Sequence, residues 1–137
     1  TGLDNYHREL VEACDGTGTE VLLVCPEVFG GLPTPRKPSE IVDGEVRTCE
    51  GISVDCEFRL GAQRALDMCE HFGGPSEISV CVLQDRSPSC GAGRVYDGTF
   101  SGTLTAGNGV FVDLLLRHGY RVIPASEFDP SMLEHCP

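Results

Sequence analysis

Hydrophobic residues along the chain follow two patterns, one typical of helices and one typical of buried strands. Apolar residues at helical spacing predict three helices, over residues 4–14, 53–72 and 107–118. Short uninterrupted apolar runs are typical of strands covered on both faces and predict three strands, over residues 21–25, 78–83 and 120–123. Helices and strands therefore alternate along the chain. This alternation predicts an α/β fold of Rossmann-like, three-layer type, in which helices flank a mostly parallel sheet.

A long segment rich in glycine and proline separates the first predicted strand from the second predicted helix. It runs from Pro26 to about Gly51, and regular structure is disfavoured over residues 29–38. A hairpin arm is predicted around residues 41–47, and a second small β-arm around residues 96–101, where an Asp-Gly pair marks a turn. A loop as long as the first segment usually carries function in a small domain.

Length and charge limit the class of protein. The chain has 137 residues without a repeat, low-complexity segment or linker, so we expect a single domain over residues 1–137. The net charge is −11, from 10 Lys and Arg against 21 Asp and Glu, which argues against a nucleic-acid-binding surface or an anionic-membrane binder. No apolar run is long enough to span a bilayer, and no signal-peptide pattern is present. We expect a cytoplasmic protein; the sequence does not indicate its oligomeric state.

Eight cysteines occur along the chain, and none is spaced as Cys-x-x-Cys, so neither a zinc knuckle nor a thioredoxin-type site is indicated. Cys69 and Cys81 fall on the apolar positions of a predicted helix and strand, which predicts small core residues. Cys25 and Cys90 each stand at or just past the end of an apolar run. Ligands of parallel sheets bind beyond the carboxyl ends of the strands. The sequence therefore indicates that these two thiols face one crevice. The other four cysteines are undecided: Cys14, Cys49, Cys56 and Cys136.

Two thiols at strand ends allow three kinds of role. They can be ligands of a soft metal or of an iron–sulfur cluster, one can be a nucleophile, or both can be incidental. The four histidines fall in predicted helices or in the tail, which disfavours a paired nucleophile. Residues 87–93 are mostly small, so their backbone amides can approach a bound inorganic group. The Gly-Asn-Gly turn at residues 107–109 is a weak signal of phosphate binding.

Longer motifs around these cysteines resemble those of a known family. Residues 25–27 read Cys-Pro-Glu and are followed by Gly-Gly-Leu-Pro-Thr-Pro-Arg at 30–36. Residues 85–91 read Asp-Arg-Ser-Pro-Ser-Cys-Gly, with Tyr-Asp-Gly-Thr-Phe and Gly-Asn-Gly-Val after them. Over residues 20–127, the sequence resembles the family known as domain of unknown function 523, whose characterised members are thiouracil desulfurases (desulfidases).

The resemblance implies a compact α/β fold and non-redox desulfuration of thiouracil or a related thiolated nucleobase. It also implies a [4Fe–4S] cluster held by three cysteines, with one iron open to accept the sulfur while water attacks the ring carbon. Cys25 and Cys90 match two of the cluster ligands. Glu27, Ser87 and Ser89 lie beside them and are candidate catalytic residues, which would orient the heterocycle or relay a proton.

The third ligand of the family has no match in this sequence. In the family it lies in a Ser-Ala-Cys-Leu-type segment after an N-terminal strand, and we expect that strand and cysteine upstream of Thr1. Cys14 is the only cysteine before Cys25, and it falls late in a predicted helix. This departure leaves two alternatives to a desulfurase: a non-catalytic domain of the same fold, or a protein with a structural zinc site formed by Cys25, Cys90 and a third residue.

Overall fold

The computed structural model describes residues 26–32 and 37–129. The chain divides into two compact units, one of residues 25–127 and the other of residues 1–24 and 128–137. The fold described below is that of the first unit. The helix predicted over residues 4–14 and the strand predicted over residues 21–25 lie outside the described residues. The single domain predicted over the whole chain stays a prediction.

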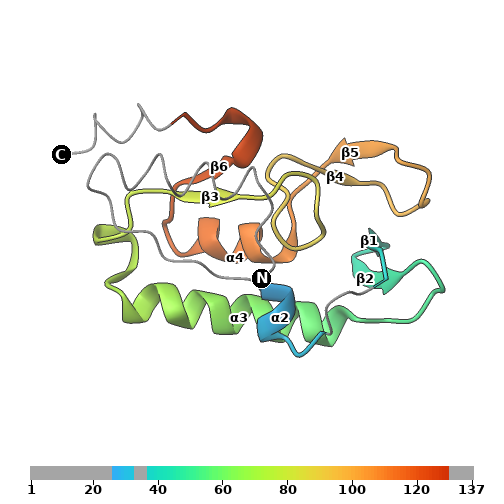
Figure 1. The fold of residues 1–137 in the computed structure, drawn as a ribbon, viewed down its shortest axis with the longest axis horizontal. Coiled ribbons are helices and arrows are strands. Elements are labelled where there is room, and N and C mark those ends of the chain that lie inside the picture. The colour runs from blue at the N-terminus through green and yellow to red at the C-terminus, as the bar shows by residue number, and fades with distance from the viewer. Residues whose placement is uncertain (1–25, 33–36, 130–137) are drawn as a thin grey trace. The chain divides into compact units, whose positions relative to one another are not determined.

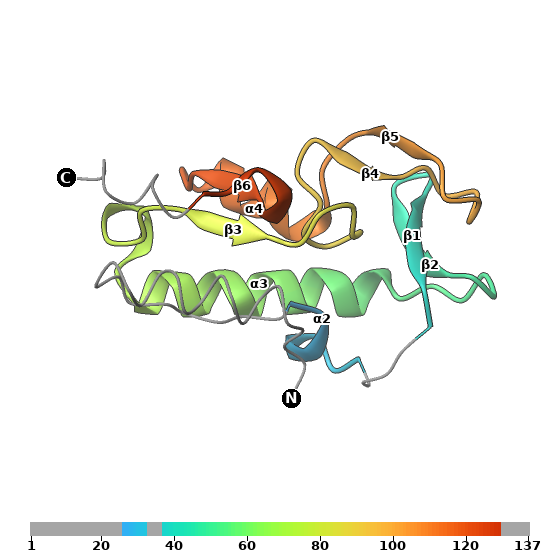
Figure 2. The ribbon, with the colours of Figure 1, turned by 45° about the horizontal axis from the view of Figure 1, so that its top comes forward.

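The described residues alternate short strands with helices of very different length (Figure 1). In chain order the elements are α2 (Pro26–Phe29), β1 (Ser39–Val42), β2 (Glu45–Thr48), α3 (Asp55–His71), η1 (Gly74–Ser76), β3 (Cys81–Leu83), β4 (Arg94–Tyr96), β5 (Leu104–Ala106), α4 (Val110–Arg117), β6 (Val122–Pro124) and η2 (Ala125–Glu127). Helix α3 runs alongside α4, and the β1–β2 and β4–β5 hairpins lie together near one end of α3 (Figures 1 and 2).

Helix α3 confirms the clearest prediction from the sequence. Its apolar stripe is buried, including Phe58, Ala65 and Cys69, because these residues recur at helical spacing. Phe72, which was predicted to end this buried stripe, instead follows the last helical residue and is exposed. The cap predicted at Ser53 is wrong. The Ser53 hydroxyl bonds the Glu45 carboxylate of the neighbouring hairpin instead, and α3 begins at Asp55 without a side-chain cap.

Helix α4 and the pairing of β3 with β6 also follow the predicted pattern. Phe111, Val112 and Leu115 form the buried stripe of α4, which packs against α3. Strands β3 and β6 pair in parallel, with Cys81 opposite Val122. The two predicted strands on either side of α4 are therefore neighbours, as an α/β crossover requires.

A Rossmann-like, mostly parallel sheet is not confirmed in the part of the chain that the structure describes. There, the strands form three two-stranded sheets, and only β3–β6 is parallel. The physical reason lies in the turns. Asp43 and Gly44 both have positive φ, at 52° and 81°, which closes β1 and β2 into a tight hairpin. The arms predicted around residues 41–47 and 96–101 are thus separate antiparallel hairpins and do not extend one sheet.

Candidate functional site

The loop between β3 and β4, residues 84–93, is called the Cys90 loop below. It holds Cys90 by hydrogen bonds within the loop itself. The Cys90 amide donates to Ser87 Oγ at 2.7 Å, and the Gly91 amide donates to the Ser87 carbonyl at 2.9 Å. A side chain at Gly91 would meet the Arg94 and Ser87 carbonyl oxygens at 2.7 and 2.8 Å, so only glycine fits there. Cys90 is half-buried, and these contacts restrict the backbone on both sides of it. Two of the amides of residues 87–93, those of Cys90 and Gly91, are thus used inside the loop and are not free for an inorganic group.

The same loop also caps α4. The amides of Gly109, Val110 and Phe111 donate to loop carbonyls at 2.8 to 2.9 Å, and the Phe111 partner is Ser89. A Cβ at Gly109 would lie 2.3 Å from the Ser89 carbonyl oxygen. Because the first amides of α4 are satisfied by the loop, they are not available to a phosphate. The phosphate-binding interpretation of the Gly-Asn-Gly turn is wrong.

Asn108 gives that turn its structural role. Its Oδ1 accepts a hydrogen bond from the Gly93 amide at 2.7 Å, and the Gly107 amide donates to the Gly93 carbonyl at 3.1 Å. The turn thus holds the far end of the Cys90 loop, while Ser87 holds its near end.

The two candidate serines have different surroundings. Ser87 is half-buried and lines a cavity. Because its oxygen accepts from the Cys90 amide, its hydroxyl hydrogen is left to donate toward the cavity. Ser89 is only 1% exposed, and its hydroxyl has no hydrogen-bond partner within the described ranges. Buried hydroxyls are ordinarily paired, so Ser89 Oγ is an orphaned polar atom next to Cys90.

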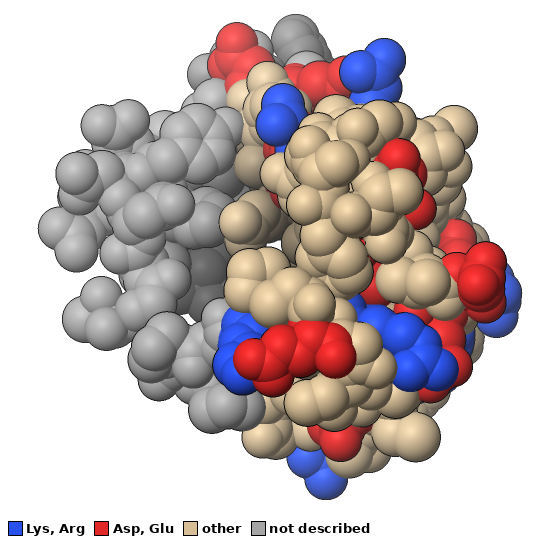
Figure 3. Space-filling model, turned by 90° about the vertical axis from the view of Figure 1, so that its right-hand side faces the viewer, with Lys and Arg blue, Asp and Glu red and all other residues tan. Residues whose placement is uncertain are grey.

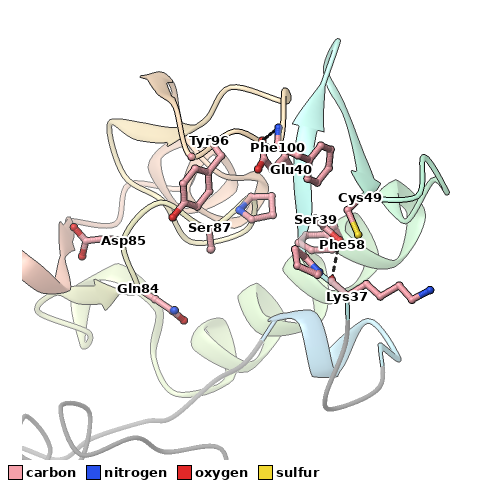
Figure 4. Close-up of a pocket in the computed structure, with 13 residues that line it drawn as sticks. Lys37, Ser39, Glu40, Cys49, Phe58, Gln84, Asp85, Ser87, Tyr96 and Phe100 are labelled. Atoms are coloured by element: carbon pink, nitrogen blue, oxygen red, sulfur yellow. Dashed lines mark hydrogen bonds between the residues drawn. The ribbon is translucent and has the colours of Figure 1, made fainter.

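The cavity beside Ser87 has a volume of about 770 Å³ and opens between the Cys90 loop and the two hairpins (Figure 4). Its described lining combines aromatic rings with polar groups and includes Glu40, Cys49, Gln84, Ser87, Tyr96 and Phe100. A volume of this size suits a small-molecule ligand. Except for Ser87, the sequence did not identify these residues as a site. Tyr96 and Phe100 belong to the Tyr-Asp-Gly-Thr-Phe motif, which was the available signal for them.

Asp85 and Lys37 at the cavity are already paired, whereas Gln84 is not. Both Asp85 carboxylate oxygens accept from Ser126, one of them from its amide at 3.0 Å. The Lys37 ammonium pairs with Glu50 at 2.5 Å, and that carboxylate raises the pKa of Lys37. Gln84 is exposed, and its carboxamide makes no hydrogen bond to any residue that the structure describes. It is therefore open to a ligand.

Helix α2 fixes the chain immediately after Cys25. A Cβ at Gly61 in α3 would lie 1.7 Å from the Pro26 carbonyl oxygen, so the two helices touch backbone to backbone. The Arg64 guanidinium also donates to the Phe29 carbonyl at 2.6 Å. Cys25 itself and the side chain of Glu27, a residue of α2, lie outside what the structure describes.

The other cysteines separate into exposed and buried thiols. Cys49 and Cys56 are exposed, and Cys69 is buried as predicted. Cys81, predicted as a core residue, is only half-buried, and this burial raises its pKa to about 12. Cys14 and Cys136 fall outside the described ranges. Over residues 26–32 and 37–129, no three His, Cys, Asp or Glu side chains are grouped so that they could hold a metal ion.

The charged residues do not gather into a basic surface on the face shown in Figure 3. There, acidic and basic side chains of the described residues are interspersed. None of the helices within the described residues is long and apolar enough to cross a membrane.

Comparison with known proteins identifies the family. The model of the 2-thiouracil desulfurase family matches residues 2–127. The chain belongs to the 2-thiouracil desulfurase family. The resemblance of the Cys-Pro-Glu and Ser-Pro-Ser-Cys-Gly motifs is thereby confirmed.

Two similar proteins show how far the similarity extends. The solved structure of the [4Fe-4S]-dependent thiouracil desulfidase TudS (DUF523Vcz) is 39% identical, with a TM-score of 0.80, and the match covers 98% of this chain and 83% of TudS. The uncharacterized protein YbbK of Bacillus subtilis (strain 168) is 36% identical over 120 residues, which cover 80% of this chain and 77% of YbbK.

Proposed function

We propose that this protein is an iron–sulfur-dependent desulfurase that removes sulfur from 2-thiouracil or a related thiolated nucleobase by hydrolysis, without net redox change. The observation that carries the proposal is the rigid Cys90 loop, which bears the family motif and borders a cavity of about 770 Å³. The similarity to a [4Fe-4S]-dependent thiouracil desulfidase supports the cofactor and the substrate class.

Cys25 and Cys90 are the two ligands that we assign to a [4Fe–4S] cluster. A half-buried cysteine on a constrained loop suits such a ligand, because thiolates bind iron and a fixed backbone sets their direction. The orphaned Ser89 hydroxyl beside Cys90 also fits, since a thiolate or sulfide would supply the acceptor that it lacks. When bound, a cluster with one open iron supplies a Lewis acid for the thiocarbonyl sulfur.

Ser87 is the catalytic candidate that the cavity favours. Its hydroxyl lines the cavity with an unused hydrogen, so it can donate to the carbonyl oxygen or the ring nitrogen of a bound base and orient it. Ser89 is too deeply buried to contact a base in this arrangement, and we assign it to support of Cys90. Glu27 remains our candidate for moving the proton of the attacking water.

The proposal predicts activity that depends on iron and sulfide. The purified protein is reconstituted anaerobically with iron and sulfide, and uracil and released sulfide are measured after addition of 2-thiouracil. We expect equal amounts of uracil and sulfide from the reconstituted protein and neither from the untreated apoprotein. A protein that retains zinc and releases no sulfide would instead be the structural zinc alternative. A protein that binds no metal and is inactive would be the non-catalytic domain.

A further inference from the structure

Glu40 is a buried carboxylate that joins two parts of the chain far apart in sequence. It lies in β1 and is only 8% exposed. Its Oε1 accepts hydrogen bonds from the Gly98 amide at 3.0 Å and from the Phe100 amide at 3.1 Å. A buried carboxylate needs such partners, and hydrogen bonds to an ionised acceptor are stronger than neutral ones. Glu40 therefore fastens the loop between β4 and β5 onto the first hairpin.

Close backbone contacts hold the loop between β4 and β5 next to the Glu40 carboxylate. Gly98 has a φ of 92°, and a Cβ there would lie 2.6 Å from the Ile41 carbonyl oxygen, so the loop backbone rests directly on β1. The Asp97 carboxylate closes the loop from within by accepting from the Thr99 amide at 3.0 Å. These contacts fix the backbone of the loop between β4 and β5 where it crosses β1.

Phe100 is held in a backbone conformation that its own side chain does not favour. Its φ is 57°, in the left-handed region, where a bulky residue is strained. The residue is 36% exposed, so core burial does not explain why the loop holds it there. The ring instead lines the cavity beside Ser87, which Tyr96 also lines (Figure 4). An aromatic ring at this place offers a flat apolar surface to a planar ligand.

We infer that Glu40 is a positioning residue of the base-binding site, which holds Phe100 as the aromatic wall against which the thiolated ring stacks. The identity of the ligand rests on the function proposed above. Glu40 itself acts through the loop and does not touch the base.

The test compares Glu40→Ala, Glu40→Gln and Phe100→Ala in the reconstituted protein. Dissociation constants for 2-thiouracil are measured by calorimetry, and kcat and KM are measured separately. Loss of one base–aromatic stack weakens binding about 5-fold to 150-fold, so we expect KM and Kd to rise by that range in Glu40→Ala and in Phe100→Ala. The value of kcat should change less than threefold, since neither residue contacts the reacting atoms, and the absorption of the cluster should be unchanged.

Glu40→Gln distinguishes positioning from charge. Its amide oxygen can still accept from both loop amides, so most of the affinity should return. Glu45→Ala is the matched control in the same hairpin, because Glu45 pairs with Arg47 and does not line the cavity. Its KM should equal that of the wild type.

Two results would overturn the inference: a folded Glu40→Ala or Phe100→Ala protein with wild-type KM and Kd, or a Glu40→Gln protein as impaired as Glu40→Ala. If Glu40→Ala does not fold, Phe100→Ala and Glu40→Gln still decide. Failure of the proposed function is a different result, namely a wild-type protein that neither binds nor desulfurates 2-thiouracil.

Discussion

Gly61→Ala is the substitution for which the structure and helix propensity predict opposite signs. Gly61 lies inside α3, where alanine is favoured over glycine by about 1 kcal/mol. From propensity alone, the variant should therefore be more stable. The added methyl group, however, would lie 1.7 Å from the Pro26 carbonyl oxygen of α2.

The size of the effect follows from this distance. Real Cβ atoms are essentially never found within 3.0 Å of such an atom, so 1.7 Å requires α2 to retreat by at least about 1.3 Å. The Arg64 hydrogen bond to the Phe29 carbonyl, now 2.6 Å, would then be weakened. Overpacking of this kind costs about 1–3 kcal/mol. Against a gain of about 1 kcal/mol, we expect a net loss of up to about 2 kcal/mol.

Chemical denaturation measures this difference, and iron content after reconstitution measures its effect on the site. Because Pro26 follows the proposed ligand Cys25, displacement of α2 should also lower the iron bound per chain. Gln63→Ala, at an exposed position two residues further along α3, is the matched control and should stay within about 0.5 kcal/mol of the wild type. A Gly61→Ala protein that is more stable than the wild type and binds as much iron would refute the reasoning.

Three further predictions concern the Cys90 loop and the reactivity of Cys49 and Cys81. Ser87→Ala removes the acceptor of the Cys90 amide and a cavity hydroxyl, so stability should fall by about 1 kcal/mol and kcat by about 10²-fold in steady-state assays; wild-type kcat would contradict this role. Asn108→Ala removes a loop contact away from the cavity and should cost about 1 kcal/mol in denaturation without changing KM; a raised KM would place Asn108 at the base. At pH 8, iodoacetamide should label the exposed Cys49 in the native protein and spare Cys81. A pKa of about 12 leaves about one Cys81 thiol in 10⁴ as the reactive thiolate at this pH. Equal labelling rates of the two cysteines, measured by mass spectrometry, would contradict the burial of Cys81.

Local periodicity allowed α3, α4, β3 and β6 to be predicted from the sequence, whereas the short helix α2 was not predicted. The apolar stripes of α3 and α4 and the runs of β3 and β6 each depend on neighbours within a few residues. The hairpin at residues 41–47 followed from its turn residues. The cap predicted at Ser53 is wrong because Glu45, eight residues away, accepts its hydroxyl hydrogen.

Site residues that belong to a sequence motif were predicted, and site residues that depend on contacts distant in sequence were missed. Cys90 and Ser87 lie together because they belong to one loop, which the motif marks. Glu40 gave no signal, since its partners are 58 and 60 residues away. Ser89 looked equivalent to Ser87 in sequence, but the capping of α4 by the loop buries it. The mostly parallel sheet was predicted because the rule that strands alternating with helices pair in parallel was applied to the whole chain. Among the described strands, that rule holds for the β3–β6 pair.

The most direct test of the account is the visible absorption and sulfide release of Cys90→Ser after anaerobic reconstitution, beside Cys49→Ser as the matched control. Cys49 is an exposed cysteine that borders the same cavity but lies outside the family motifs. We predict that the wild type and Cys49→Ser turn brown, absorb at about 400 nm and release sulfide from 2-thiouracil, while Cys90→Ser loses colour and activity together. A Cys90→Ser protein with wild-type absorption and sulfide release would contradict the account.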